Sequence, residues 1–508
     1  MKMYLVLLSA LWSSALMAHE IHIDTDTLKK NLGQSSSRAI FSDKHRKIPP
    51  ESLAVPSVVT GGRFNENHIN RAIAEWSLRQ VNDSLRLIDD PWVNEQILTM
   101  SAQMNAQVRT QALFALPIIH DDNINAFAVP GGLIGINTGT ILSSETMDEV
   151  AGVLAHEIAH LSQRHYEQRQ DEKGKLMALQ LGGLLAAVLA SSVSGDLATT
   201  ALIGSQTATA ESMATHSRDH EREADRIGMQ IMSQAGYDAR AMAVFFGKLY
   251  KQVAHLQKDA FIPSFVQSHP LTAERLSDAT SRASQYPVMS MIAKNNHAKM
   301  FDKLSWRLKY LTKQASMTDL KNASSHSLGA KLAWINALSD DGNTKQALQL
   351  LQTGDFERTD PLVCITHAHV LAKQGDHTQA VAVLKSCHAL YPERRDLRLH
   401  LASELAQVGQ TALALSLVTP LTNQNNHDRQ AWRITQQIHE KSTTNHTSSA
   451  IYALHARSQV ELWSGQYQGA LQSNAQAIKL AKQHPNLGLL SMLESSKQAM
   501  IQAKDYKP

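Results

Sequence analysis

The sequence predicts a mainly α-helical protein, in which a helical domain with a small β-sheet is followed by an α-solenoid of helix pairs. Apolar residues recur at helical spacing over residues 66–116, and again from residue 148 onward. Between these regions, the stretch 113–142 alternates apolar and polar residues and is punctuated by Gly, Pro and Asn, which indicates two or three short strands. Beyond residue 300 the helical pattern repeats almost to the end of the chain.

The length and composition exclude several classes of protein. With 508 residues the chain is too long for one ordinary core, so we expect two or more domains. Hydrophobic residues make up 43% and charged residues 19%, which is typical of a globular rather than a disordered chain. The net charge of +3 is nearly balanced, and no basic run or basic-aromatic patch is present. We therefore expect no nucleic acid as a partner.

The first residues are typical of an export signal. One lysine precedes an apolar stretch that begins at Tyr4 and is shorter than the roughly 20 residues that span a bilayer. The pattern predicts a signal peptide over residues 1–18, cleaved after Ala18, and a mature protein in a bacterial periplasm. An uncleaved anchor is the alternative, because Leu16 stands where a small residue is usual. No cysteine follows the apolar stretch, which excludes lipidation there.

Changes in composition divide the rest of the chain. Residues 19–62 are polar and rich in Pro and Gly, which predicts an N-terminal arm or linker. Residues 63–290 are expected to form the first domain, and residues 291–508 the second. The most apolar interior run, 176–193, contains two glycines, a glutamine and two serines. It favours a buried or membrane-surface helix, with possible peripheral membrane contact, over a membrane span.

The second domain carries an internal repeat. Four glycines are each followed five residues later by an alanine: Gly342 and Ala347, Gly375 and Ala380, Gly409 and Ala414, Gly465 and Ala470. The first three glycines are 33 and 34 residues apart, which predicts tetratricopeptide repeats. The longer gap before the fourth glycine holds a degenerate unit. A solenoid of such helix pairs offers a concave groove for peptides or a partner protein.

The chain has only two cysteines, Cys364 and Cys387. Two thiols are too few for a zinc site made of cysteines, and the chain is not a disulfide scaffold. In an oxidising compartment the two can pair with each other. The alternative is that both are small buried apolar residues.

The motif HEIAH predicts a metal site. On a helix, residues i and i+4 share a face, so His156 and His160 can direct ring nitrogens at one ion. Glu157 then lies beside the ion rather than on it, where it can take a proton from water as a general base. A catalytic zinc site needs a third protein ligand and keeps a fourth position open.

A second helix, SRDHEREADRIG, supplies the third ligand. Glu221 can bind the metal while Asp225, four residues later, accepts a hydrogen bond from a ligand histidine and fixes its tautomer. Glu223 lies about 200° around the helix from Glu221 and should face elsewhere. His216 and His220 are rival ligands, but neither is followed by an Asp four residues later. We therefore expect one Zn²⁺ per chain.

Together, these motifs resemble those of a known family. The chain resembles the gluzincin metallopeptidases, which include the β-barrel assembly-enhancing proteases, in INAFAVPGGLIGINTGTI, DEVAGVLAHEIAHLSQRH, SRDHEREADRIG and HPLTAERL, within residues 60–290. The resemblance implies a zinc metallopeptidase domain with ligands His156, His160 and Glu221 and base Glu157. It implies a periplasmic endopeptidase, associated with the outer membrane, with a chaperone-like role in the assembly and quality control of outer-membrane β-barrel proteins.

The resemblance also implies partners. Unfolded or stalled outer-membrane proteins would be the substrates, and the barrel-assembly machinery would bind the repeats. The glycine-rich stretch GGLIGINTG is expected to be an edge strand that holds an extended substrate. The competing interpretation is a non-proteolytic chaperone or scaffold that acts through its tetratricopeptide repeats. The intact Glu157 argues against it.

The segment HPLTAERL contributes two further candidates, His269 and Arg275. In the family this segment lies near the active site. His269 can occupy the open fourth position of the metal and make the enzyme latent. Alternatively, His269 can stabilise the oxyanion formed during attack, with Arg275 adding positive charge. A helix-capping or loop histidine before Pro270 is the third interpretation.

Overall fold

The computed structural model describes residues 63–108, 112–164, 209–254, 263–442, 446–483 and 487–508. The signal peptide expected over 1–18, the arm expected over 19–62 and the apolar run 176–193 lie outside these ranges. Within them, no helix has both the length and the apolar character needed to cross a membrane.

The first half of the described chain is helical with a small β-sheet, as the sequence predicts. Its elements up to residue 162 are α2 (Arg63–Ser84), α3 (Pro91–Asn105), β1 (Ile118–Ile119), β2 (Ala126–Val129), β3 (Leu133–Asn137), α4 (Thr138–Ser143) and α5 (Met147–Ser162). They are followed by α9 (Thr209–Gln234), α10 (Arg240–Ala254), α11 (Ser264–Ser268) and α12 (Ala273–Ala283). The mainly helical fold class is confirmed.

The sheet has the order β1-β3-β2, so β3 is its central strand. It runs parallel to β1 and antiparallel to β2. The expectation that GGLIGINTG forms an edge strand is therefore wrong. Gly131 and Gly132, with φ of 92° and 90°, turn the chain back from β2 into β3, and the segment before residue 120 pairs with the other side of β3. Within the described residues, β2 pairs with β3 alone.

Helix α5 is the centre of this half, and it is buried along almost its whole length. It packs against β2, α9 and α10. Two glycines allow the close helix packing: a Cβ added at Gly152 would lie 3.3 Å from the Cα of Met242, and one at Gly228 would lie 3.3 Å from the backbone of Ala155. Both contacts are tight, so an added side chain would require the neighbouring helix to shift by a few tenths of an ångström.

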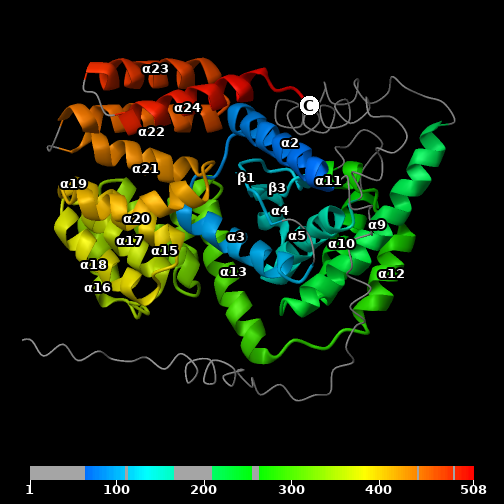
Figure 1. Cartoon of the computed structure of the whole chain (residues 1–508). Helices are drawn as coiled ribbons and strands as arrows, with labels where there is room; N and C mark the ends of the chain where they lie inside the picture. The colour runs from blue at the N-terminus through cyan, green and yellow to red at the C-terminus, as the bar shows by residue number, and fades with distance from the viewer. Residues whose placement is uncertain (1–62, 109–111, 165–208, 255–262, 443–445, 484–486) are drawn as a thin grey trace, which may run out of the picture. The chain divides into compact units, whose positions relative to one another are not determined.

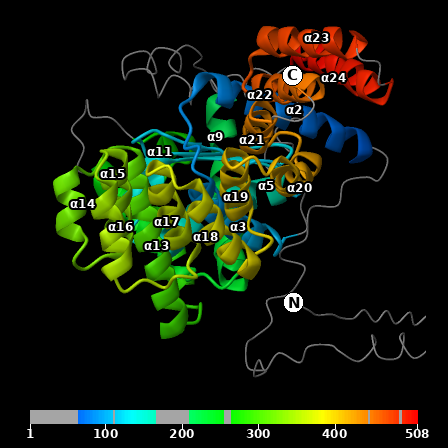
Figure 2. The ribbon, with the colours of Figure 1, turned by 90° about the vertical axis from the view of Figure 1, so that its left-hand side faces the viewer.

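The second half consists of helices, most of them in pairs. They are α13 (Met291–Leu311), α14 (Met317–Ala323), α15 (Leu328–Asp340), α16 (Thr344–Thr353), α17 (Pro361–Lys373), α18 (His377–Leu390), α19 (Arg395–Gln407), α20 (Thr411–Gln424), α21 (Arg429–Glu440), α22 (His446–Trp463), α23 (Tyr467–Gln483) and α24 (Leu487–Asp505). Figures 1 and 2 show α17, α18 and α19 side by side.

The four repeat glycines lie in the turns between paired helices, as predicted. Gly342, Gly375, Gly409 and Gly465 all have φ between 75° and 84°, a conformation that a side chain disfavours. The alanine five residues after each glycine is fully buried. In the second repeat, Cys364 on α17 and Cys387 on α18 form a disulfide, with their Cα atoms 6.5 Å apart. This finding decides between the two interpretations of the cysteines.

The repeat helices also contact the first half directly. Figures 1 and 2 show α2 beside α22, and the side chain of Asn82 donates a hydrogen bond of 2.6 Å to the carbonyl of Trp463. The ring of Trp463 lies in one apolar cluster with Ile73 of α2 and Phe127 of β2. Helix α13 contacts α3, α4 and α5 as well as α15. The domain boundary at residues 290 and 291 stays a prediction.

Arg307 of α13 is expected to stabilise the junction with α3. Its guanidinium lies 2.7 Å from the carboxylate of Asp90, which also caps α3 by accepting a hydrogen bond from the amide of Val93. Burial alone would raise the pKa of Asp90, but the charge and hydrogen bonds of Arg307 hold that pKa below its usual value. The stabilisation is therefore present above about pH 4 and is lost as the pH falls through the depressed pKa.

Arg307→Met should lower the free energy of unfolding by about 3–5 kcal/mol at pH 7, because it leaves a buried carboxylate unpaired. Denaturant unfolding at pH 7 measures the loss. Arg282→Met is the matched control, since Arg282 pairs with Asp278 on the exposed face of α12 and should contribute less than about 1 kcal/mol. Equal losses in the two variants would contradict the role assigned to the buried pair.

Candidate metal centre

Helix α5 places two histidines on one buried face. The side chain of Thr146 caps the helix by accepting a hydrogen bond from the amide of Glu149. Acidic residues occupy the first turn, where their negative charge interacts favourably with the helix dipole. His156 and His160 lie one turn apart in the last half of this helix and are both buried. Their Nε2 atoms are 3.0 Å apart, so both rings are directed at the same point.

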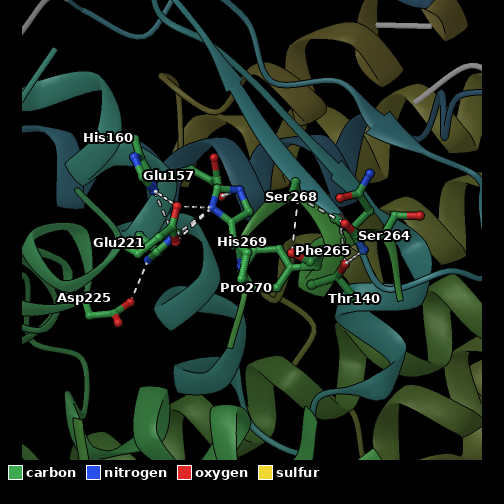
Figure 3. Close-up of polar contacts among 12 residues, drawn as sticks. Thr140, Glu157, His160, Glu221, Asp225, Ser264, Phe265, Ser268, His269 and Pro270 are labelled. Carbon is green, nitrogen blue, oxygen red and sulfur yellow. Dashed lines mark hydrogen bonds and ion pairs between the residues drawn. The ribbon is translucent and has the colours of Figure 1, made fainter. Parts of the chain in front are cut away.

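Two further groups converge on that point. Helix α9 brings the carboxylate of Glu221 to 3.3 Å from Nε2 of His156 and to 3.5 Å from Nε2 of His160. His269, at the C-terminal end of α11, brings its Nδ1 to 3.1 Å from Glu221 and 3.3 Å from Nε2 of His156. Figure 3 shows His160, Glu221 and His269 directed toward one another, with Glu157 beside them.

The donor atoms of these four residues fit a metal ion. Four ligands at 2.0–2.1 Å from a tetrahedral zinc ion lie about 3.3 Å from one another. The donor separations given above range from 3.0 to 3.5 Å, and all four residues are buried. Three imidazole nitrogens and one carboxylate form a borderline, nitrogen-rich donor set of the kind that zinc prefers. Within the described residues, this is the only such group that could hold a metal ion.

Glu157 lies beside the group and contributes no ligand atom to it. The side chain is fully buried, and among the described residues neither of its oxygens has a hydrogen-bond partner. Nε2 of His269 lies 3.5 Å from its Oε1. Burial raises the pKa of Glu157 above its usual value. A buried carboxyl with a raised pKa and no hydrogen-bond partner among the described residues, next to a metal site, is suited to accept and donate a proton.

Asp225 and Arg275 lie behind the histidines and Glu221. An oxygen of Asp225 is 3.0 Å from Nδ1 of His156, on the side of the ring opposite the converging Nε2. Arg275 contacts both oxygens of Asp225 at 2.8 Å and reaches Glu221 at 3.1 Å and the carbonyl of Pro270 at 2.9 Å. The geometry therefore joins Arg275 to the carboxylates and to the segment that carries His269.

The charges of the group depend on these partners. Burial opposes a charge on His156, but hydrogen bonds to Asp225 and Glu221 raise its pKa to about 9. Burial lowers the pKa of His160 to about 3. Without a metal, His156 is therefore protonated on both ring nitrogens, and positively charged, near neutral pH. A metal ion has to displace one of these protons, so metal affinity should rise with pH.

The structure separates the remaining candidates from the group. Glu223 points elsewhere on α9 and lies 3.8 Å from Arg226. His220 is not among the four converging residues. The side chain of His216 lies outside the described residues.

Two residues near the site carried no sequence signal. Thr140 of α4 fixes the start of β2: its hydroxyl accepts the amide of Asn125 at 2.8 Å and donates to the carbonyl of the same residue at 2.7 Å. Phe265 of α11 is buried, with its ring centroid 4.9 Å from that of His269. An isolated threonine and an isolated phenylalanine are too common for a pattern to single them out. A regular spacing such as that of HEIAH is much rarer.

Comparisons with known proteins identify families for two parts of the chain. Residues 88–283 match peptidase family M48, and residues 371–438 match the tetratricopeptide repeat. The matched peptidase segment contains all four converging residues.

Curated relatives extend the similarity over most of the chain. The β-barrel assembly-enhancing protease of Yersinia pestis is 28% identical over 403 residues, which cover 77% of this chain and 81% of the relative. The protein of the same name from Escherichia coli K12 is 26% identical over 81% of this chain and 85% of its own. The bovine mitochondrial metalloendopeptidase OMA1 is 25% identical over 52% of each chain. The chain thus carries a peptidase domain of family M48 followed by tetratricopeptide repeats, and it is a metalloendopeptidase.

Proposed function

We propose that the protein is a periplasmic zinc endopeptidase with chaperone-like activity, which degrades misassembled outer-membrane β-barrel proteins. The observation that carries this proposal is the buried group of His156, His160, Glu221 and His269, with the carboxyl of Glu157 beside it. The names of the relatives from Yersinia pestis and Escherichia coli support the link to β-barrel assembly.

In the proposed reaction, His156, His160 and Glu221 hold the zinc ion. When bound, zinc supplies a Lewis acid that polarises the substrate carbonyl and lowers the pKa of water. Glu157 takes the proton of the attacking water and passes it to the leaving amine, and its raised pKa makes it a stronger base for the first of these transfers. Asp225 orients the ring of His156, and Arg275 holds Asp225 in place.

The strand that receives the substrate is β2 rather than β3. Because β3 is paired on both sides, its main-chain groups are not available to a further strand. β2 pairs only with β3 within the described residues, and it contacts α5, which carries the zinc-binding histidines. An extended substrate would add to the outer edge of β2 through main-chain hydrogen bonds. Such binding favours unfolded clients, since folded proteins rarely present a free extended segment.

His269 is proposed to be the fourth ligand of the zinc ion in a latent state. Its Nδ1 lies with the donor atoms of the other three residues, which supports this role over that of an oxyanion donor. Arg275 is tied to Asp225 and Glu221, which supports a positioning role for it over a contribution to oxyanion stabilisation.

The remaining parts of the proposal concern location and partners. The predicted signal peptide supports export to the periplasm. The tetratricopeptide repeats support binding of the barrel-assembly machinery and of clients, because helix-pair solenoids bind polypeptides along their surfaces. Residues 176–193 are proposed to make peripheral contact with the membrane.

The proposal is tested with one outer-membrane β-barrel protein in two states, unfolded by dilution from urea and folded in detergent micelles. The purified enzyme should cleave the unfolded state and leave the folded one intact, and a chelator should stop the cleavage. Zinc added back should restore it. If neither state were cleaved by the zinc-loaded protein, or if cleavage continued in the chelator, the proposed function would be wrong.

A further inference from the structure

The outer edge of β2 already has one partner. The amide of Asn137 in β3 donates to the carbonyl of Asn125, so Asn125 faces β3. Main-chain groups alternate in direction along a strand, so those of Ile124, Ala126 and Ala128 face away from β3. The amide of Phe265 donates a hydrogen bond of 3.1 Å to the carbonyl of Ile124. The start of α11 thus occupies the first acceptor of the edge that an extended substrate would use.

The same short helix carries His269. The amide of His269 donates to the carbonyl of Phe265 at 2.8 Å, and the hydroxyl of Ser268 reaches that carbonyl at 3.2 Å. The ring of Phe265 is buried, and its centroid lies 4.9 Å from that of His269 and 5.9 Å from that of His156. Figure 3 shows Phe265 between Thr140, at the strand side, and His269, at the metal group. One helical turn therefore connects the substrate edge to the fourth ligand position.

We propose that Phe265 is a positioning residue that holds His269 in the metal group, and that an extended substrate displaces Phe265 and His269 together by taking the carbonyl of Ile124. This inference rests on the proposed function, because it assumes that substrate adds to β2. A strand that pairs with Ala128 and Ala126 reaches Ile124 next, and there it meets the amide of Phe265. The added strand and the first turn of α11 compete for the same acceptor.

The competition sets a minimum length for the substrate segment that can open the site. The distance from Ala128 to Ile124 along a strand is about 14 Å, because an antiparallel strand rises about 3.4 Å per residue. A bound segment shorter than about five residues would pair with Ala128 and Ala126 and leave Phe265 in place. A longer extended segment would reach Ile124 and release His269. The latent state would then open only for long unfolded clients.

The test uses full-length protein carrying Glu157→Gln, so that substrate binds without being cut. Cobalt(II) replaces zinc as a probe, because its visible absorption depends on the number and type of its ligands. The unfolded protein β-casein serves as substrate, and its binding is followed separately by fluorescence anisotropy. Binding of β-casein should change the cobalt spectrum, and the same addition to a protein that also carries His269→Ala should change it far less. Binding with an unchanged spectrum would overturn the proposal.

Phe265→Ala tests the positioning role of Phe265 directly. It should tighten β-casein binding about tenfold, because less free energy is needed to displace α11. In the active enzyme it should lower KM by a similar factor without lowering kcat, whereas general damage to the site would lower kcat. Phe265→Leu, which keeps a large apolar side chain, should give a β-casein affinity between those of wild type and Phe265→Ala. It keeps the test available if the alanine variant does not fold.

The matched control is Phe246→Ala. Phe246 of α10 is equally buried, and its ring centroid lies 6.4 Å from that of His156 and 5.3 Å from the guanidinium carbon of Arg275, so it packs against the metal group from α10 rather than from α11. It should not tighten β-casein binding. Equal tightening in both phenylalanine variants would contradict the assignment to Phe265. Failure of the proposed function is seen separately, as absence of metal-dependent cleavage by the protein with Glu157 intact.

Discussion

Glu157→Gln is expected to reduce peptide-bond cleavage by at least about 10³-fold while leaving metal binding unchanged. The substitution keeps the size of the side chain but removes its capacity to accept a proton, and general acid-base catalysis contributes roughly 10²–10⁴-fold. The effect should be at the upper end, since neither oxygen of Glu157 has a hydrogen-bond partner among the described residues, whereas the other non-ligating carboxylate, Asp225, is held by Arg275 and His156. Initial rates of cleavage of an unfolded protein measure the loss of activity, and mass spectrometry of the metal content measures whether metal binding is unchanged.

The matched control for this variant is Glu223→Gln. Glu223 lies on α9, two residues from Glu221, but its carboxylate is directed toward Arg226 and away from the metal group. Activity should be retained there. The same pair of variants separates the enzyme from the scaffold interpretation. If wild type and Glu157→Gln both left an unfolded outer-membrane protein intact and both suppressed its aggregation, the repeats alone would carry the function.

His269→Ala is expected to raise the rate of cleavage by about tenfold, if the open state is populated to about one tenth in the latent enzyme. The physical reason is that Nδ1 of His269 lies among the donor atoms of His156 and Glu221, where it would fill the position that substrate needs. Steady-state cleavage of unfolded β-casein, compared with His220→Ala as a control, measures the change. His220 lies beside Glu221 in the sequence but outside the converging group.

The opposite sign would reassign His269. A fall of about 10²–10³-fold is typical of the loss of one oxyanion donor and would make His269 a transition-state stabiliser. An unchanged rate, together with metal content equal to that of wild type, would leave His269 as a capping residue of α11. The cobalt spectrum of His269→Ala distinguishes a lost ligand from a lost hydrogen bond.

The local parts of the site could be predicted from the sequence. His156 and His160 are four residues apart on one helix, and Glu221 and Asp225 are four apart on another, so their faces follow from helical geometry alone. The role of the repeat glycines could also be predicted from the sequence. Each lies in a short turn in which its own φ is above 70°, and that turn is formed by residues close together in the chain. These features depend on residues close together in the chain.

The remaining features depend on long-range packing. The alternation of GGLIGINTG predicts a strand, but the position of that strand in the sheet depends on β1, which pairs with it from outside the hairpin. The contact of Asn82 with Trp463 joins residues 381 positions apart. The bond from Phe265 to Ile124 is a main-chain contact and has no side-chain signature. No spacing rule reaches these contacts.

The most direct test of the metal centre is the zinc content of the purified full-length protein, measured with and without its proposed ligands. Wild type should hold about one zinc ion per chain, and the double variant His160→Ala and Glu221→Ala should hold far less while its circular dichroism stays helical. The double variant should also lose cleavage of β-casein. A wild-type protein that cleaves β-casein without bound metal, or a double variant that keeps one zinc ion per chain, would contradict the assignment of the metal centre to these residues.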